Sequence, residues 1–141
     1  MKSRTWARAF LRHALVRERL PLDGDTYWLA LHDKAPGEDQ QEAETGYEGY
    51  ARVALPLSPE MWRIVDGDAD ADVPVTAENL QLIRMPLCTG GPELEISHWT
   101  IGLAQAGPGD VRFKGEFDTP FTIKPNRRPE FEPGDLKLEE F

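Results

Sequence analysis

Cysteine is almost absent from this chain, and the histidine spacings that bind metals are absent altogether. The 141 residues include a single cysteine, Cys88, so an intrachain disulfide is excluded. None of the three histidines, His13, His32 and His98, has a second histidine two or four residues away, which excludes the usual zinc patterns. We therefore expect no cofactor, and we expect Cys88 to act as a small buried apolar residue.

Long apolar runs and catalytic motifs are also missing. No stretch approaches the roughly 20 apolar residues that a membrane-spanning helix needs, so we expect no membrane partner. Gly90-Gly91 and Gly107-Pro108-Gly109 do not lead into a helix, which argues against a phosphate-binding loop. Ser97 and His98 are adjacent in a predicted strand and should point to opposite faces, so we expect that they cannot pair directly. The chain is not expected to be an enzyme.

Charge is plentiful but unevenly distributed along the chain. The net charge is −9, and the first 20 residues hold six basic residues and one acidic residue, or +5, so the other 121 residues carry −14. An acidic body repels nucleic acid, and no nucleic-acid partner is expected. A basic segment on an acidic body favours an arm that docks on an acidic partner.

Residues 3–19 are predicted to form the one convincing helix of the chain. Apolar and basic side chains both recur at helical spacing, and Pro21 marks the end. The apolar face consists of Trp6, Phe10, Leu11, Ala14 and Leu15, and the basic row of Arg4, Arg8 and Arg12. The helix could pack on its own domain, dock on a neighbouring subunit, or bind a membrane or nucleic acid. The acidic body disfavours the last alternative, and we favour docking.

From residue 22 onward the apolar period falls to two, which is typical of strands. Twelve glycines and twelve prolines are spread along the chain as turn signals, while four Trp, six Phe and three Tyr supply material for a core. Strands are expected at residues 26–32, 50–57, 62–65, 80–85, 96–104, 111–117, 121–123 and 131–138. Trp28 and Trp99 are expected in the core, and residues 33–46 are predicted to form a long exposed loop.

These patterns predict an all-β fold. We expect a jelly-roll-like β-sandwich of about seven or eight short antiparallel strands over residues 22–141. One N-terminal amphipathic helix forms a basic arm over residues 1–21.

An acidic run offers a weak candidate for a metal site. Asp66, Asp68, Asp70 and Asp72 alternate with small residues, as the oxygen ligands of a calcium loop do. The pattern fails further on, because the sixth position is Ala71 and the twelfth is Ala77, where an EF-hand has Gly and Glu. A solvated acidic loop is therefore the favoured interpretation, and no metal is predicted.

Five segments, in order, resemble the small virion proteins of tailed double-stranded-DNA bacteriophages. They cover roughly residues 26 to 138 and are Trp28-Leu29-Ala30-Leu31-His32, Gly49-Tyr50-Ala51-Arg52-Val53, Ile96-Ser97-His98-Trp99-Thr100-Ile101-Gly102, Lys114-Gly115-Glu116-Phe117 and Phe131-Glu132-Pro133-Gly134-Asp135-Leu136-Lys137-Leu138. The resemblance implies a β-sandwich without catalytic residues, of the kind described as head decoration (cement) or tail-fibre-like proteins.

The main hypothesis from this resemblance is a decoration protein on the outer surface of a phage capsid, made in the host cytoplasm. Its partners would be the phage major capsid protein and other copies of itself on the lattice, bound without any chemical step. Trp and Arg dominate many interfaces, so the candidate contact residues are Arg4, Trp6, Arg8, Phe10, Arg12 and Trp62. The alternative is a tail-fibre or baseplate module that binds the host surface or other tail proteins.

Overall fold

The computed structural model describes residues 1–22, 24–68 and 70–140, and within them the chain is mostly β-structure with a single N-terminal helical segment. That segment consists of α1 (Arg4–Leu11) and a π-helical turn, η1 (Arg12–Val16). The strands are β1 (Thr26–His32), β2 (Val53–Pro56), β3 (Trp62–Val65), β4 (Val75–Asn79), β5 (Ile83–Arg84), β6 (Leu94–Gly102), β7 (Val111–Ile123), β8 (Glu130–Phe131) and β9 (Lys137–Glu140). The predicted all-β, sandwich-like class is confirmed.

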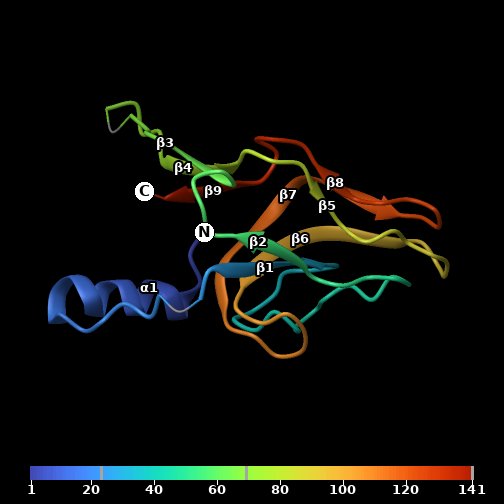
Figure 1. Cartoon of the computed structure of the whole chain (residues 1–141), viewed down its shortest axis with the longest axis horizontal. Helices are drawn as coiled ribbons and strands as arrows, with labels where there is room; N and C mark the ends of the chain where they lie inside the picture. The colour runs from blue at the N-terminus through green and yellow to red at the C-terminus, as the bar shows by residue number, and fades with distance from the viewer. Residues whose placement is uncertain (23, 69, 141) are drawn as a thin grey trace.

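The larger sheet has the order β2-β1-β6-β7, and all neighbouring strands are antiparallel (Figure 1). β1 and β6 are its central strands, and β1 has the bounds that the sequence predicts. Alternate side chains of β1 point to opposite faces, yet Ala30 and Leu31 are both fully buried. The sheet is therefore covered on both faces at its centre.

Two smaller sheets, β3-β4-β9 and β5-β8, cover one face of the larger sheet (Figure 1). Apolar side chains from all three sheets meet in one core, which explains why these short strands hold together. Its fully buried large members include Leu29, Leu31, Leu55, Met85, Ile96, Ile101 and Leu136. Cys88 is fully buried in the same core, as the sequence predicts.

Several predicted boundaries are wrong, each for a local reason. The helix ends at Val16 because Arg17 adopts a left-handed conformation, with φ of 61°. β7 runs unbroken from Val111 to Ile123, so the two strands predicted there are one. β4 was not predicted, because its sequence lacks apolar alternation and it is held instead between β3 and β9. Only Ile83–Arg84 of the predicted strand at residues 80–85 is a strand.

The loop at residues 33–46 is not the exposed segment that its composition suggests. It packs on the second face of β1, where the side chain of Gln40 is fully buried and donates from Nε2 to the Trp28 carbonyl at 2.9 Å. His32 is fixed at Nδ1 by the Glu42 carbonyl (2.9 Å) and at Nε2 by Thr100 Oγ1 (2.8 Å), and burial lowers its pKa. Trp28 is half-buried and does not belong to the apolar core, so the prediction that it packs there is wrong. Trp99 is buried in the core, as predicted.

A largely buried ion pair ties the same loop to the rest of the body. Arg52 binds both carboxylate oxygens of Glu44, at 2.7 and 2.9 Å, and donates to the carbonyls of Ala104 (2.9 Å) and Gly107 (2.6 Å). Tyr50 donates its hydroxyl to the same carboxylate at 2.6 Å, and burial and that bond raise its pKa. The guanidinium has a partner on each of its nitrogens, so this loop and the β6–β7 turn are fixed to each other.

Candidate functional site

The first three residues extend the larger sheet at its β7 edge. The amino group of Met1 donates to the Lys114 carbonyl at 3.1 Å, and the Lys114 amide donates to the Met1 carbonyl at 2.9 Å. The Ser3 amide donates to the Arg112 carbonyl at 2.8 Å, and Lys2 forms a bridge with Phe113. The basic arm is therefore joined to the body by backbone pairing before its helix begins.

The first turn of α1 is also anchored on the body. Ser3 Oγ caps the helix by accepting from the Trp6 amide at 3.0 Å. Glu38 accepts from the Thr5 amide (2.9 Å) through one oxygen and from Lys114 Nζ (3.1 Å) through the other. Burial acts to raise the pKa of Glu38, but these hydrogen bonds outweigh it and hold the pKa below its ordinary value. Glu38, which sequence reasoning missed, thus fixes where the helix starts.

Trp6 completes this anchor and is the one residue of α1–η1 that is buried. Its ring lies under the guanidinium of Arg112, 4.5 Å from the ring centroid, and 7 % of its surface is exposed. The sequence proposed Trp6 as a contact for a partner. The structure places it against its own domain.

Beyond the first turn the helix leaves the body and projects from one end of the molecule (Figure 1). Leu11, Leu15 and Val16 are 58 %, 77 % and 65 % exposed. They border a shallow hollow whose other walls are Arg4, Ala7, Arg8 and Arg12. An amphipathic helix usually buries its apolar stripe, so this one presents a stripe without a partner among the described residues.

The other predicted contact residues on the helix are exposed as well. Arg4 and Arg8 lie on the surface, and Arg12 forms an exposed ion pair with Glu18 at 3.5 Å. Phe10 is 46 % exposed, and the Lys2 ammonium lies 4.8 Å from its ring centroid. The structure therefore brings the predicted basic row and an apolar stripe together on one projecting helix.

A second projection, the hairpin of β3 and β4, lies at the same end of the long axis (Figure 1). Ile64 pairs with Ala77, and Val75 lies two residues before Ala77 on the same strand, so the three share one face of the ribbon. Ala77 packs against the core, whereas Ile64 and Val75 are 64 % and 43 % exposed. The hairpin thus extends past the edge of the core with its inner face uncovered. Sequence reasoning missed this, because it treated Ile64 only as part of a strand.

The acidic run forms the tip of this hairpin. Asp68 and Val73 pair through both backbone amides (3.0 and 2.8 Å), and the Asp68 carboxylate accepts from the amides of Asp70 and Ala71. Gly67 lies against the backbone of Val73 and Pro74, where a Cβ would collide. Asp68, one of the four aspartates of the weak calcium candidate, therefore serves as a turn former. Residue 69 lies outside the described residues.

Trp62, the remaining predicted contact residue, is half-buried. Its Nε1 donates to the Pro56 carbonyl at 3.1 Å, and its ring packs against the core. It supports the root of the hairpin, with only part of its surface accessible to a partner.

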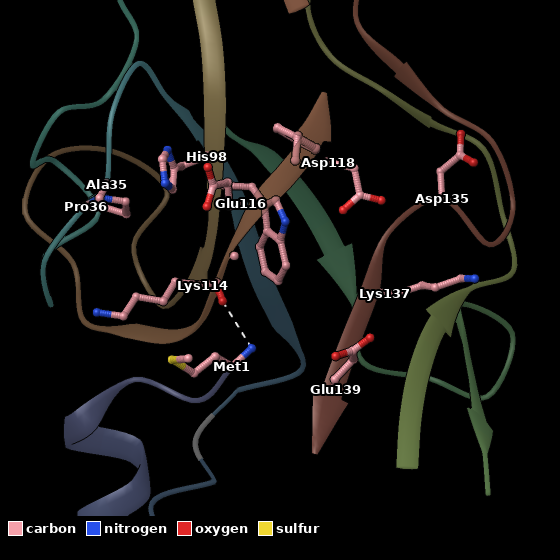
Figure 2. A pocket seen from close by; sticks show the side chains of 13 residues that line it. Met1, Ala35, Pro36, His98, Lys114, Glu116, Asp118, Asp135, Lys137 and Glu139 are labelled. Atoms are coloured by element: carbon pink, nitrogen blue, oxygen red, sulfur yellow. Dashed lines mark hydrogen bonds between the residues drawn. The ribbon is translucent and has the colours of Figure 1, made fainter. Parts of the chain in front are cut away.

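A groove with a volume of about 620 Å³ lies elsewhere, between β7 and the segment that ends in β9 (Figure 2). Figure 2 shows side chains of both signs around it. Its lining also includes Trp99, whose indole lies against Gly115. The charged residues of its lining are Lys114, Glu116, Asp118, Asp135, Lys137 and Glu139, together with His98. Because the two signs are mixed, the groove does not select one class of charged ligand.

Ser97 and His98 do pair, contrary to the expectation from strand alternation. Ser97 Oγ lies 2.7 Å from His98 Nδ1. The pairing of β6 with β7 shifts register between Ile96 and His98, and such a bulge turns neighbouring side chains toward each other. Ser97 donates its hydroxyl to the Asp33 carbonyl at 2.9 Å, so the hydrogen between Ser97 and His98 comes from Nδ1. This arrangement orients the imidazole and does not draw a proton from the serine.

Among the residues that the structure describes, no group of three or more His, Cys, Asp or Glu side chains is placed to hold a metal ion. Among the same residues, no helix combines the length and the apolar character needed to cross a membrane.

The sequence of the chain matches one known family along nearly its whole length. Residues 2–139 match the family described as Podophage GP4 fiber I protein gp80. No curated protein matches the chain. The family match indicates a structural protein of a phage particle, and the β-rich fold is consistent with it. The chain therefore belongs to the podophage GP4 fiber I protein gp80 family and is a structural protein of a bacteriophage virion.

Proposed function

We propose that this protein is a tail-associated structural subunit of a podophage fibre that binds other virion proteins through its projecting end. The observation that carries this proposal is a helix anchored at its first turn and left uncovered beyond it. A firmly fixed root with an exposed apolar and basic outer part is the arrangement of a docking element. The family description supports a fibre, and hence the tail, over the outer capsid surface.

The proposed mechanism is binding alone, without a chemical step. Leu11 and Leu15 would supply apolar area, and Arg4 and Arg8 would select an acidic partner. The body of the protein, which the Arg52–Glu44 pair ties together, would hold the projecting helix against its partner. The opposite end of the molecule would face away from that partner.

Copy number and position in the virion test the proposal. Heads and tails are separated from purified virions, and the protein is quantified in each fraction against the major capsid protein. The proposal predicts that the protein stays with tails, at a few copies for each tail. A decoration protein would instead stay with heads, in proportion to the capsid subunits, and that result would overturn the tail assignment.

A further inference from the structure

The two projections at one end of the molecule carry complementary surfaces. The overhanging end consists of the α1–η1 helix and the outer part of the β3–β4 hairpin (residues 64–75). Both lie at the same end of the long axis (Figure 1), and both leave apolar side chains uncovered. Their charges are opposite, although they belong to the same chain.

Both projections expose aliphatic side chains. On the helix, Leu11, Leu15 and Val16 are each more than half exposed. On the hairpin, Ile64 and Val73 are 64 % and 51 % exposed, and Val75 is 43 % exposed. Each group alone is small, and each would be covered if the two were packed together.

The charged side chains of the two projections are opposite in sign. Arg4, Arg8 and Arg12 flank the apolar stripe of the helix, and the turn of the hairpin carries four aspartates within residues 66–72. Among the described residues, the ion pairs of the chain leave Arg4, Arg8 and all four of these aspartates uninvolved. Placed opposite each other, the two groups would steer association and fix its orientation.

We propose that the α1–η1 helix of one copy docks on the β3–β4 hairpin of a second copy of this chain. Each copy carries both halves of the contact, so two copies can make it twice in a self-complementary arrangement. The first turn of the helix contacts β7 and Glu38 of its own body. Leu11, Leu15 and Val16, further along the helix, remain exposed and are left for the second copy. This inference rests on the proposed function and deepens it, since it names the partner of the surface assigned there.

Charge reversal in matched pairs tests the inference on the full-length chain. One variant, Arg4→Glu with Arg8→Glu, makes the helix acidic, and a second, Asp66→Lys with Asp70→Lys, makes the hairpin tip basic. All four side chains are exposed, and neither pair contributes a side-chain bond that holds the fold among the described residues. Sedimentation equilibrium then measures the mass of each protein alone and of an equimolar mixture of the two.

The wild-type chain is expected to self-associate, and each variant alone is expected to sediment as a single chain. In the mixture the acidic helix of one variant meets the basic hairpin of the other, and the remaining helix and hairpin keep their native signs. The mixture is therefore expected to associate again. Far-UV circular dichroism identical to wild type shows that each variant is folded.

Matched controls separate this contact from general charge or apolar effects. Arg127→Glu with Arg128→Glu reverses two exposed arginines outside the overhanging end and should leave self-association unchanged. Leu15→Asp should abolish it, whereas Leu103→Asp, at a leucine that is 36 % exposed elsewhere, should not. A wild-type chain that stays single at all concentrations, or a mixture that fails to associate, would overturn the inference. Neither result bears on whether the protein is found with tails, so the proposed function is tested separately.

Discussion

The body and the overhanging end use the same kinds of residue in opposite ways. Arg52, in the body, is 6 % exposed and bonded to Glu44 and two backbone carbonyls, while Arg8, on the helix, is exposed. Trp99 is buried on Gly115, whereas Leu15 projects into solvent. The body therefore pairs most of its buried polar groups internally and buries a shared apolar core, whereas the overhanging end leaves its largest apolar side chains exposed for another surface.

The largest expected effect comes from breaking the internal pairing of the body. Arg52→Ala leaves the partly buried Glu44 carboxylate without its guanidinium, and it also leaves the Ala104 and Gly107 carbonyls without that donor. Removing one partner of a buried pair typically costs about 3–5 kcal/mol, so the free energy of unfolding should fall by about that amount. Urea denaturation measures it. A loss well below about 1 kcal/mol would show that the pair does not hold the loop.

A second change tests the close packing of Trp99 on Gly115. In Gly115→Ala the new Cβ would lie 2.5 Å from Trp99 Cζ2, which the close-packed interior cannot accept without movement. Overpacking of this kind costs about 1–3 kcal/mol, measurable as a lower Tm. Gly107→Ala introduces the same methyl group where no atom lies within 4 Å, although at a positive φ of 71°, so it isolates the effect of backbone strain. Equal stability of Gly115→Ala and wild type would contradict the close packing of the Trp99 ring against Gly115.

A third change separates the helix from the body. Trp6→Ala removes the one buried anchor of α1–η1, so the amides of residues 4–16 should lose protection in hydrogen-exchange mass spectrometry. The strands should keep theirs, and the free energy of unfolding should fall by about 1.5–3 kcal/mol, the scale of burying one large apolar side chain. Phe10→Ala, at an exposed position, is the control. Global unfolding of the Trp6 variant would mean that the helix belongs to the core.

The smallest expected effect concerns pH. The folded-state pKa of Glu38 is held below the ordinary value of 4.5, so its contribution to anchoring is present above that value and is lost as the pH falls through the lower folded value. Protection of residues 4–16 should therefore decrease on acidification before the strands lose theirs. Glu38→Gln, which cannot pair electrostatically with Lys114, should show the weakened anchoring already at neutral pH. Unchanged protection in that variant would remove Glu38 from the anchor.

How far the sequence predicts this structure depends on how local the signal is. β1 and the single helix are read correctly in kind, because the apolar period is strong in each. β4 is missed because its position is set by pairing with β3 and β9, which are distant or weakly patterned. The burial of Gln40 is missed because a polar loop is hidden here by specific hydrogen bonds, not by apolar composition.

The same distinction applies to the candidate site. The basic row of Arg4, Arg8 and Arg12 is predictable from spacing, and the structure confirms that these side chains lie together on the helix. The anchoring role of Trp6 is not predictable, because it depends on Arg112, which is more than 100 positions away in the sequence. The exposed inner face at Ile64 is likewise hidden from the sequence, since it depends on where the core ends.

Protection of the helix inside the virion tests the central claim most directly. Cys88 is fully buried, so Leu15→Cys and Leu103→Cys each add one accessible thiol, on the helix and on the body respectively. Labelling by a maleimide is compared between each purified chain and virions that carry it. The account predicts that position 15 labels in the purified chain when dilute and is protected in the virion, while position 103 labels in both. Equal labelling of position 15 in the dilute chain and in the virion would contradict the assignment of the overhanging end as the assembly surface.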